Sequence, residues 1–220
     1  MASKEINSEP AIHMLTVSKE YIIKIAGMHH KFVNYFSRIS PLSVEESNAI
    51  AENMCIKNFK KGAYLLKEGQ LSVDTYFILE GCIREFIVMD GEEKTTNFFT
   101  EEQWVISLNN FGPQSPATHN LVCVEDTTVS IGNERLAQVL FKRFPRFETI
   151  SRIIVEADFA NQKKLLTSYL ADSPEQRYLK LLESRPDLFQ RVPQYQLASY
   201  IGVKPESLSR IRKRVFEGLK

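Results

Sequence analysis

Apolar and polar residues follow two different periods along this chain, and the period changes twice. Residues 32–58 carry apolar side chains at helical spacing, with the spacing of a capping box at Ser43 and Glu46. Short runs rich in β-forming residues then alternate with glycines, and Asp90-Gly91 between two such runs predicts a tight hairpin. Helical spacing returns afterwards. This order predicts an α+β protein with an N-terminal antiparallel β-roll or barrel of the jelly-roll (double-stranded β-helix) type.

The longest predicted helix spans residues 144–171. Its apolar positions recur at steps of three and four, as in a coiled-coil seam, and Asn161 can set the register of such a seam. We interpret this helix as a dimerisation helix, although the same face can instead pack on its own domain. Asp172-Ser173-Pro174 breaks the chain after it. The predicted seam comprises Phe147, Ile150, Ile154, Ala157, Asn161 and Leu165.

The C-terminal part has the pattern of a helix, a tight turn and a second helix. Leu197, Ala198 and Ile201 form one apolar stripe, Gly202 can adopt the positive φ that ends a helix, and Pro205 suits the first turn of the next one. The second helix has one apolar face and one polar, basic face. A helix that packs on a core and lies in a DNA major groove needs both faces, so the pattern predicts a DNA-binding helix-turn-helix.

Positive charge is concentrated in the same part of the chain. The formal net charge is only +1, but residues 191–220 hold seven Lys and Arg against two acids, and the remaining residues carry a net charge of −4. This distribution favours phosphate binding through one module. The alternative is a solvated basic helix. Because the basic cluster coincides with the helix-turn-helix pattern, we favour DNA binding and a role in transcription.

The composition excludes several other classes of protein. No run of about 18 apolar residues and no apolar signal core are present, which predicts a cytoplasmic protein that binds no membrane. The three cysteines are far apart, which argues against disulfides and against an iron–sulfur cluster. We expect no metal site and no haem, because the histidines are candidates by residue type alone. No phosphate-binding loop, zinc-protease or serine-hydrolase motif is present, so we predict no enzyme.

Two stretches resemble the Crp/Fnr family of bacterial transcription regulators. The first is residues 61–69 (KGAYLLKEG) followed by residues 76–84 (YFILEGCIR), which share the glycine turn, the Glu-Gly pair and the strand that leads into Gly-x-x-Arg. The second is residues 197–203 (LASYIGV) followed by residues 206–210 (ESLSR). The resemblance covers about residues 32–214. It implies a homodimer that binds a palindromic operator in double-stranded DNA, with RNA polymerase as a further candidate partner.

The resemblance also implies how the chain is divided. It predicts an N-terminal extension (1–28), a β-roll sensor domain like those that bind cyclic nucleotides (29–143), the long dimerisation helix (144–171) and a winged-helix-type helix-turn-helix domain (172–220). Family members usually continue into a β-hairpin wing, so we expect the wing to be truncated at Lys220. That truncation supports an alternative function, a ligand-binding or interaction module of the same fold that no longer reads DNA.

In this resemblance Glu206, Ser209 and Arg210 would read base edges. The chemistry agrees, since Arg can donate two hydrogen bonds to guanine, Glu accepts one from cytosine and Ser adapts to either. An alternative role for Glu206 is to stabilise the helix N-terminus. The side chains better placed for DNA phosphates are Gln194, Lys204, Ser207, Arg212, Lys213 and Arg214.

The predicted sensor pocket departs from the family pattern. Cyclic-nucleotide binders carry a Gly-Glu pair for the ribose and an Arg for the cyclic phosphate. Here Ile106-Ser107 takes the place of the Gly-Glu pair, and residues 115–120 (SPATHN) contain no Arg or Lys. A buried phosphate without a cationic partner is costly, so we predict that the roll does not bind cAMP or cGMP in the usual way.

An apolar pocket between the roll and the long helix remains a candidate site for an unknown small-molecule effector. The alternative is that its aromatic side chains fill the space that a nucleotide occupies in relatives. The candidate residues are Phe98, Phe99, Trp104, Phe111 and His119.

Overall fold

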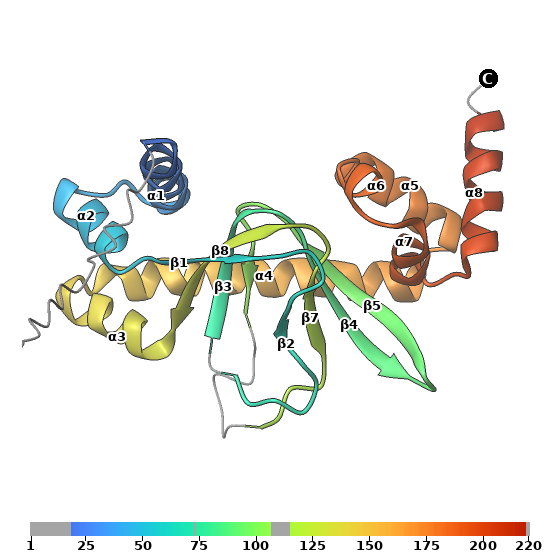
Figure 1. The fold of residues 1–220 in the computed structure, drawn as a ribbon. Coiled ribbons are helices and arrows are strands. Elements are labelled where there is room, and N and C mark those ends of the chain that lie inside the picture. Colours follow the sequence, from blue (N-terminus) through green and yellow to red (C-terminus); the bar gives the residue numbers. More distant parts are fainter. Residues whose placement is uncertain (1–18, 73, 107–114, 219–220) are drawn as a thin grey trace, which may run out of the picture.

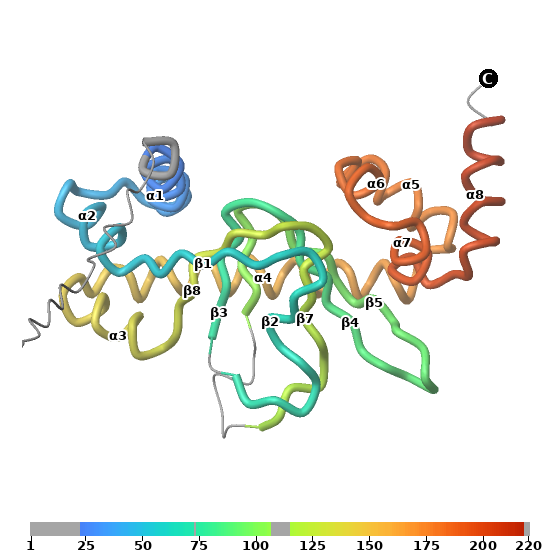
Figure 2. Tube along the Cα trace, in the orientation of Figure 1, coloured from blue at the N-terminus to red at the C-terminus, as the bar shows by residue number. Residues whose placement is uncertain are grey.

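The computed structural model describes residues 19–72, 74–106 and 115–218. The long helix α4 (Arg146–Ala171) runs along the molecule past the strands (Figure 1). Helices α1 (Lys19–Ile39), α2 (Val44–Glu52) and α3 (Glu134–Arg143) lie towards one end of α4, and the C-terminal helices lie at the other (Figure 2). The predicted α+β class is confirmed.

The described strands form two antiparallel four-stranded sheets, in the orders β1-β8-β3-β6 and β2-β7-β4-β5. No strand pairing among the described residues joins the sheets into a closed barrel, so the roll is the form that the chain adopts. The strands are β1 (Cys55–Phe59), β2 (Tyr64–Leu66), β3 (Asp74–Glu80), β4 (Ile83–Met89), β5 (Glu92–Phe99), β6 (Trp104–Val105), β7 (Asn120–Cys123) and β8 (Thr127–Asn133).

The predicted hairpin joins β4 to β5. Asp90 has a φ of 53° and Gly91 a φ of 78°, the left-handed values that a type I′ turn requires. Met89 and Glu92 are paired directly across the turn. The hairpin prediction is therefore confirmed, and the strand that follows the turn contacts the C-terminal helices.

The N-terminal part differs from the prediction at two points. Helix α1 continues through the expected boundary between residues 28 and 29, because Met28 and Phe32 lie one turn apart and are buried in the same cluster. The capping box of Ser43 and Glu46 begins α2 as predicted, but the helix ends at Glu52, and residues 55–59 form β1. Local apolar spacing does not reveal the pairing of β1 with β8, which overrides it.

Three apolar clusters hold the elements together. One fills the roll between the two sheets, and another joins the roll to the helices at the N-terminal end through aromatic contacts. In that second cluster the ring of Phe77 lies 4.9 Å from Phe32 and 5.1 Å from Trp104, between ring centroids. The third cluster is the core of the C-terminal helices, and it includes Cys82, Phe98 and Val124 of the roll.

The predicted seam of α4 is divided by the structure into two halves. The first half is buried against α1 and the roll of the same chain, so it is not available to a partner, and this part of the seam prediction is wrong. The apolar spacing correctly identified the face of α4 that is buried in this half, but it could not show that elements of the same chain cover that face. The second half is exposed. The buried residues are Phe147, Ile150 and Ile154, and the exposed ones are Ala157, Asn161 and Leu165.

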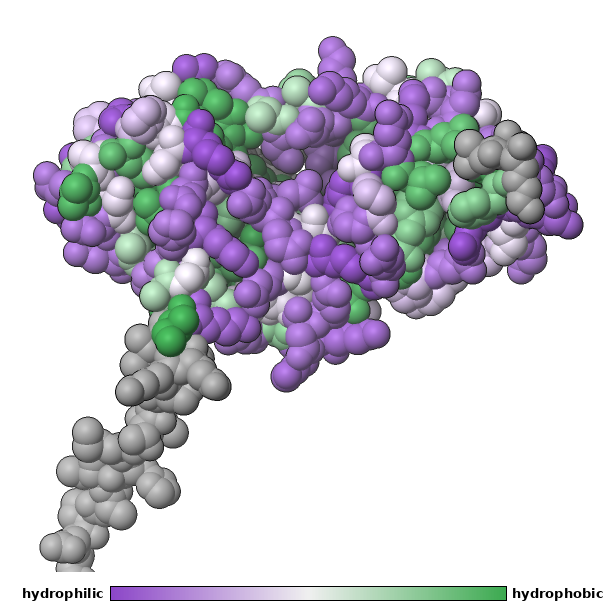
Figure 3. Space-filling view, turned by 90° about the horizontal axis from the view of Figure 1, so that it is seen from above, coloured by the Kyte–Doolittle hydropathy of each residue, from purple (hydrophilic) through white to green (hydrophobic). Residues whose placement is uncertain are grey.

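Hydrophobic side chains gather towards both ends of the surface seen in Figure 3, and hydrophilic residues cover much of the region between them. On the second half of α4, Phe159, Leu166 and Leu170 are 67%, 61% and 79% exposed. Among the described helices, none combines the length and the apolar character needed to span a bilayer.

Candidate nucleic-acid interface

Four helices build the C-terminal domain: α5 (Pro174–Ser184), α6 (Leu188–Arg191), α7 (Gln194–Ile201) and α8 (Pro205–Gly218). Helix α7 ends at Gly202, which has a φ of 81°, and the N–H of Val203 donates to the carbonyl of Ala198 at 2.9 Å. The carbonyl of Lys204 then accepts from the N–H groups of Ser207 and Leu208. The predicted helix, turn and second helix are therefore present.

Helix α8 has one buried and one exposed face. Leu208, Ile211 and Val215 are buried against the other C-terminal helices. The polar side chains lie on the remaining surface, and Figure 1 shows α8 at the outer edge of the molecule. The amphipathic pattern of the sequence thus places the basic face of α8 in solvent, where a large ligand can reach it.

The three predicted base-reading residues lie together in the first turns of α8. Glu206, Ser209 and Arg210 are all exposed. The Ser209 hydroxyl donates to the Pro205 carbonyl at 3.2 Å, while the Arg210 guanidinium donates to the Glu206 carbonyl at 3.4 Å and to the Ser207 hydroxyl at 3.3 Å. These contacts are local and long, so the side chains can turn towards a ligand without breaking the fold.

The predicted phosphate-contacting residues surround this group. Gln194 stands in the first turn of α7, and Lys204 precedes α8. Arg212 and Arg214 are two positions apart and so point to nearly opposite sides of α8, as needed to reach phosphates on both sides of a groove. Ser207 is half-buried, whereas the other five are exposed: Gln194, Lys204, Arg212, Lys213 and Arg214.

A hollow of about 480 Å³ lies between the start of α5 and the side of α8. Its lining includes Ser207, Arg210 and Arg214 from α8 and Glu175 from α5. Arg214 forms an ion pair with Glu175 at 2.8 Å. The hollow therefore joins a predicted base-reading arginine to a predicted phosphate-binding one.

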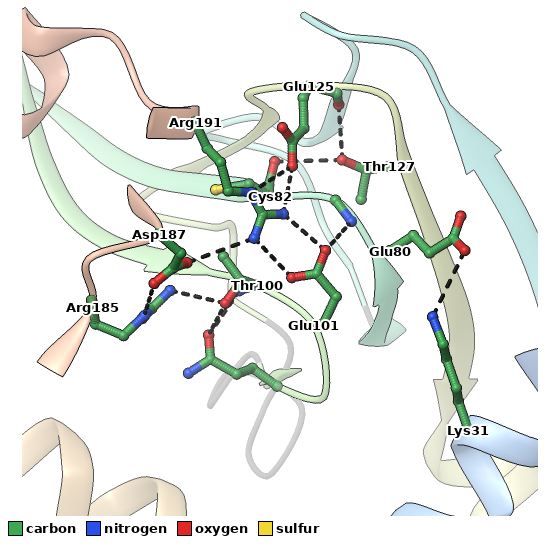
Figure 4. A network of polar contacts seen from close by, with 12 residues as sticks. Lys31, Glu80, Cys82, Thr100, Glu101, Glu125, Thr127, Arg185, Asp187 and Arg191 are labelled. Carbon is green, nitrogen blue, oxygen red and sulfur yellow. Dashed lines mark hydrogen bonds and ion pairs between the residues drawn. The ribbon is translucent and has the colours of Figure 1, made fainter. Parts of the chain in front are cut away.

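Arg191 at the end of α6 ties the C-terminal domain to the roll (Figure 4). Its guanidinium donates two hydrogen bonds of 2.8 Å to the carboxylate of Glu101 and contacts Glu125 at 2.5 Å. Burial opposes ionisation of Glu101, but the hydrogen bonds from Arg191 and from the Gly81 N–H outweigh it and hold its pKa below the ordinary value. We call Arg191, Glu101 and Glu125 the interdomain ion cluster.

Two further contacts fix the same interface. The Arg185 guanidinium donates to the Thr100 hydroxyl at 2.9 Å. The Ser199 hydroxyl of α7 accepts from the N–H of Thr95 at 2.9 Å and donates to the carbonyl of Glu93 at 3.1 Å, so it completes hydrogen bonds of strand β5. The helix-turn-helix is therefore bound to the hairpin of the roll by its own first helix.

The apolar part of this interface contains a buried thiol. Cys82 is fully buried in the same cluster as Leu197 and Ile201, and burial raises its pKa to about 12. A thiol with such a pKa stays protonated near neutral pH, and it packs as a small apolar side chain.

The predicted effector pocket is not assembled as one site. Phe98 lies in the cluster of the C-terminal domain, Phe99 inside the roll, and Trp104 in the cluster with α1 and α4. Phe98 and Phe99 separate because neighbouring residues of a strand point to opposite faces. His119 lies apart, 3.9 Å from Glu85, and Phe111 lies outside the described residues. The described aromatic residues fill three cores, which corrects the prediction of a single pocket.

Sequence reasoning missed the residues that act across domains. Arg191, Ser199 and Glu175 had no assigned role, and their partners lie far away in the sequence. The basic character of residues 191–220 was visible, but the acids that pair with it belong to other elements. Only the three-dimensional structure reveals such pairs.

Comparisons with known proteins agree with this architecture. Residues 56–143 match the cyclic nucleotide-binding domain family. FixK2 from Bradyrhizobium japonicum superposes with a TM-score of 0.63 at 12% identity, covering 75% of this chain and 85% of that chain. The c-di-GMP-responsive global regulator CLP from Xanthomonas campestris gives a TM-score of 0.61 at 14% identity, covering 88% of this chain and 92% of that chain. No curated protein sequence matches the chain.

A CooA variant from Carboxydothermus hydrogenoformans is also similar, with a TM-score of 0.58 and 15% identity over 76% of this chain and 78% of that chain. Residues 56–143 thus match the cyclic nucleotide-binding domain family, and the chain shares its fold with FixK2, CLP and CooA. The resemblance seen in the sequence is confirmed.

Proposed function

We propose that the chain is a homodimeric, sequence-specific DNA-binding transcription regulator of the Crp/Fnr type. The observation that carries this proposal is the exposed face of α8, which presents Glu206, Ser209 and Arg210 together while its opposite face is buried. A helix exposed in this way at the edge of a domain can enter the major groove. The basic residues around it supply the phosphate contacts that hold the helix in position.

Each of the three residues has a role that fits its chemistry. Arg210 donates two hydrogen bonds to the O6 and N7 atoms of a guanine, and Glu206 accepts one from the amino group of a cytosine. Ser209 either donates or accepts, so it adapts to the base pair between them. Their positions within one turn place all three over neighbouring base pairs of one half-site.

A second copy of the chain provides the second half-site. We place the dimer contact on the exposed half of α4, where Val155, Phe159, Gln162, Leu166 and Tyr169 follow alternating steps of four and three. Phe159, Leu166 and Tyr169 are all more than half exposed, which is costly in water and is relieved by a partner helix. Two recognition helices then contact half-sites about one helical turn, roughly 34 Å, apart.

We further infer that cAMP and cGMP are not bound in the usual way. Arg84 is the one buried basic residue among those described, and its guanidinium is already held by Glu93 at 2.5 Å and by the Thr95 hydroxyl at 2.8 Å. Ala117 pairs its backbone with Gly69 and Gln70, and its segment, residues 115–120, contains no Arg or Lys. A cyclic phosphate would therefore lack a cationic partner there.

Two substitutions on α8 test the assignment of base reading. Arg210→Ala should weaken binding to the specific operator by about 1–3 kcal/mol and relax the base preference at one position per half-site. Lys213→Ala, the matched control, should weaken binding to specific and random duplexes alike, because a phosphate contact carries no sequence information. Fluorescence anisotropy with both duplexes measures this. An equal loss on both duplexes for Arg210→Ala would make Arg210 a phosphate contact.

A further inference from the structure

An exposed ion pair connects the proposed recognition helix to helix α5. The guanidinium of Arg214 lies 2.8 Å from the carboxylate of Glu175, and both side chains remain substantially in solvent. Glu175 belongs to the first turn of α5, where the helix dipole favours an acid. The pair lies in the hollow that also contains Ser207 and Arg210.

We propose that Glu175 competes with a DNA phosphate for Arg214 and so limits how tightly the chain holds DNA. This inference rests on the proposed DNA binding and adds to it a residue that lowers affinity. Most residues of the interface are expected to attract the phosphate backbone. Glu175 is the only acid among the described residues that line the hollow, where Arg210 and its ion-pair partner Arg214 also lie.

The position of the pair supports this role. Arg210 and Arg214 are four residues apart on α8 and therefore share one side of the helix. If Arg210 faces the bases, the hollow lies at the margin of the DNA-binding surface, and Arg214 lies at the edge of that surface. The DNA phosphates run along the edges of a recognition helix that lies in the major groove. The carboxylate of Glu175 therefore pairs with the Arg214 guanidinium that a phosphate oxygen would otherwise contact.

Replacing the Glu175 carboxylate with a DNA phosphate as the partner of Arg214 is energetically feasible. An ion pair between exposed side chains is weak, because water and salt screen it and both side chains lose freedom. A phosphate between neighbouring phosphates offers Arg214 a stronger negative potential than a single carboxylate does. DNA can therefore displace Glu175, but the chain gives up one charge contact on binding, and the carboxylate left behind repels the phosphate.

The chain offers a matched control. Glu183 is another exposed acid on helix α5, and it does not line the hollow. Neutralising either glutamate changes the net charge by one unit, so any general effect of charge on DNA binding appears in both variants. Only a local competition for Arg214 distinguishes Glu175 from Glu183.

The test measures binding of the full chain to a specific and to a random duplex by anisotropy over a range of salt concentrations. Glu175→Gln should bind both duplexes more tightly than wild type and more tightly than Glu183→Gln. Its dependence of log K on log salt should steepen by about 0.9, the value of one added phosphate contact. Its advantage should then shrink by about 3.5-fold between ~50 mM and ~200 mM salt. In an Arg214→Gln background, Glu175→Gln should increase binding no more than Glu183→Gln does.

Three results would overturn the proposal: a gain no larger than that of Glu183→Gln, an unchanged salt slope, or a gain beyond that of Glu183→Gln that persists without Arg214. Thermal unfolding of each variant shows that the fold is intact. If wild type and Glu175→Gln both fail to bind either duplex, the DNA-binding function itself fails, and the inference falls with it. That result is distinct from a wild type that binds DNA and a Glu175→Gln variant that binds equally well.

Discussion

The turn between α7 and α8 depends on one residue without a side chain. Gly202 has a φ of 81°, and a Cβ atom placed there would lie 2.6 Å from the hydroxyl oxygen of Tyr169. Tyr169 is in turn covered by the guanidinium of Arg177, 4.8 Å from the ring centroid, and Arg177 donates to the Ile201 carbonyl at 2.8 Å. The end of α4 is thereby packed directly against the helix-turn-helix corner.

Gly202→Ala should destabilise the chain by about 1–2 kcal/mol, because it adds backbone strain at a positive φ and pushes Tyr169 aside. Gly27→Ala is the matched control: Gly27 lies in helix α1 with open space around its Cβ position, so this change should stabilise by about 0.5–1 kcal/mol. Chemical denaturation of the two variants measures both effects. Equal stabilities would contradict the role given to Gly202.

Single residues with a local geometric role were the most predictable part of the chain. Gly202, Pro205 and the Asp90-Gly91 turn could be placed from sequence, since each acts through its own backbone. Glu175 and Arg191 could not, because each acts through a partner on another element. The exposure of the α8 side chains followed from amphipathic spacing, but the ion pair that binds Arg214 did not.

The two halves of helix α4 lie in different environments. Its first half is a core helix of the roll, covered by α1, and its second half carries large apolar side chains in solvent. Apolar spacing predicted the helix but placed the first half of the dimer seam, Phe147, Ile150 and Ile154, where the chain itself covers it. Which side a partner uses depends on tertiary packing, so periodicity alone could not decide between the two interpretations.

Leu166→Asp should convert the dimer to a monomer while leaving the fold intact, because an exposed leucine makes no core contacts to lose. Ile154→Ala should instead lower the free energy of unfolding by about 2–5 kcal/mol, since Ile154 is buried in its own domain. Sedimentation velocity and denaturation distinguish the two variants. A Leu166→Asp protein with unchanged mass would remove the proposed seam.

The whole molecule is organised around the docking of the helix-turn-helix on the roll. The interdomain ion cluster, the Ser199 contacts with strand β5 and the shared apolar cluster all join the two parts. Glu101 comes only a few residues before Gln103 and Trp104, in the same connection that leads into strand β6. A change in that connection would therefore reach the C-terminal helices through the contact of Glu101 with Arg191.

Arg191→Gln should loosen this docking and lower stability by about 1–3 kcal/mol, because Glu101 and Glu125 lose their partner. Hydrogen exchange should accelerate at the N–H of Thr95, which donates to Ser199 across the interface, and at the N–H of Gly81, which donates within the roll to the Glu101 carboxylate that Arg191 holds. Lys60→Gln removes an ion pair confined to the roll and should leave the exchange rates of both N–H groups unchanged. Unaltered exchange in Arg191→Gln would show that the cluster does not hold the domains together.

The same docking should weaken in acid. The pKa of Glu101 is lower in the folded chain than in the unfolded one, so its contribution is fully present above the ordinary glutamate value of about 4.3 and is lost as the pH falls through the lower folded value. Exchange at the Gly81 N–H, followed downwards from pH 6 and corrected for intrinsic rates, measures this. In Arg191→Gln the acid-dependent increase should be smaller.

The most direct measurement is a selection of duplexes from a random library with the purified 220-residue chain and no added ligand. The proposed function predicts enrichment of an inverted repeat whose half-sites are about one helical turn apart, and loss of one base preference per half-site in Arg210→Ala. Recovery of sequences no different from the starting library, by a protein that is folded and dimeric, would contradict it.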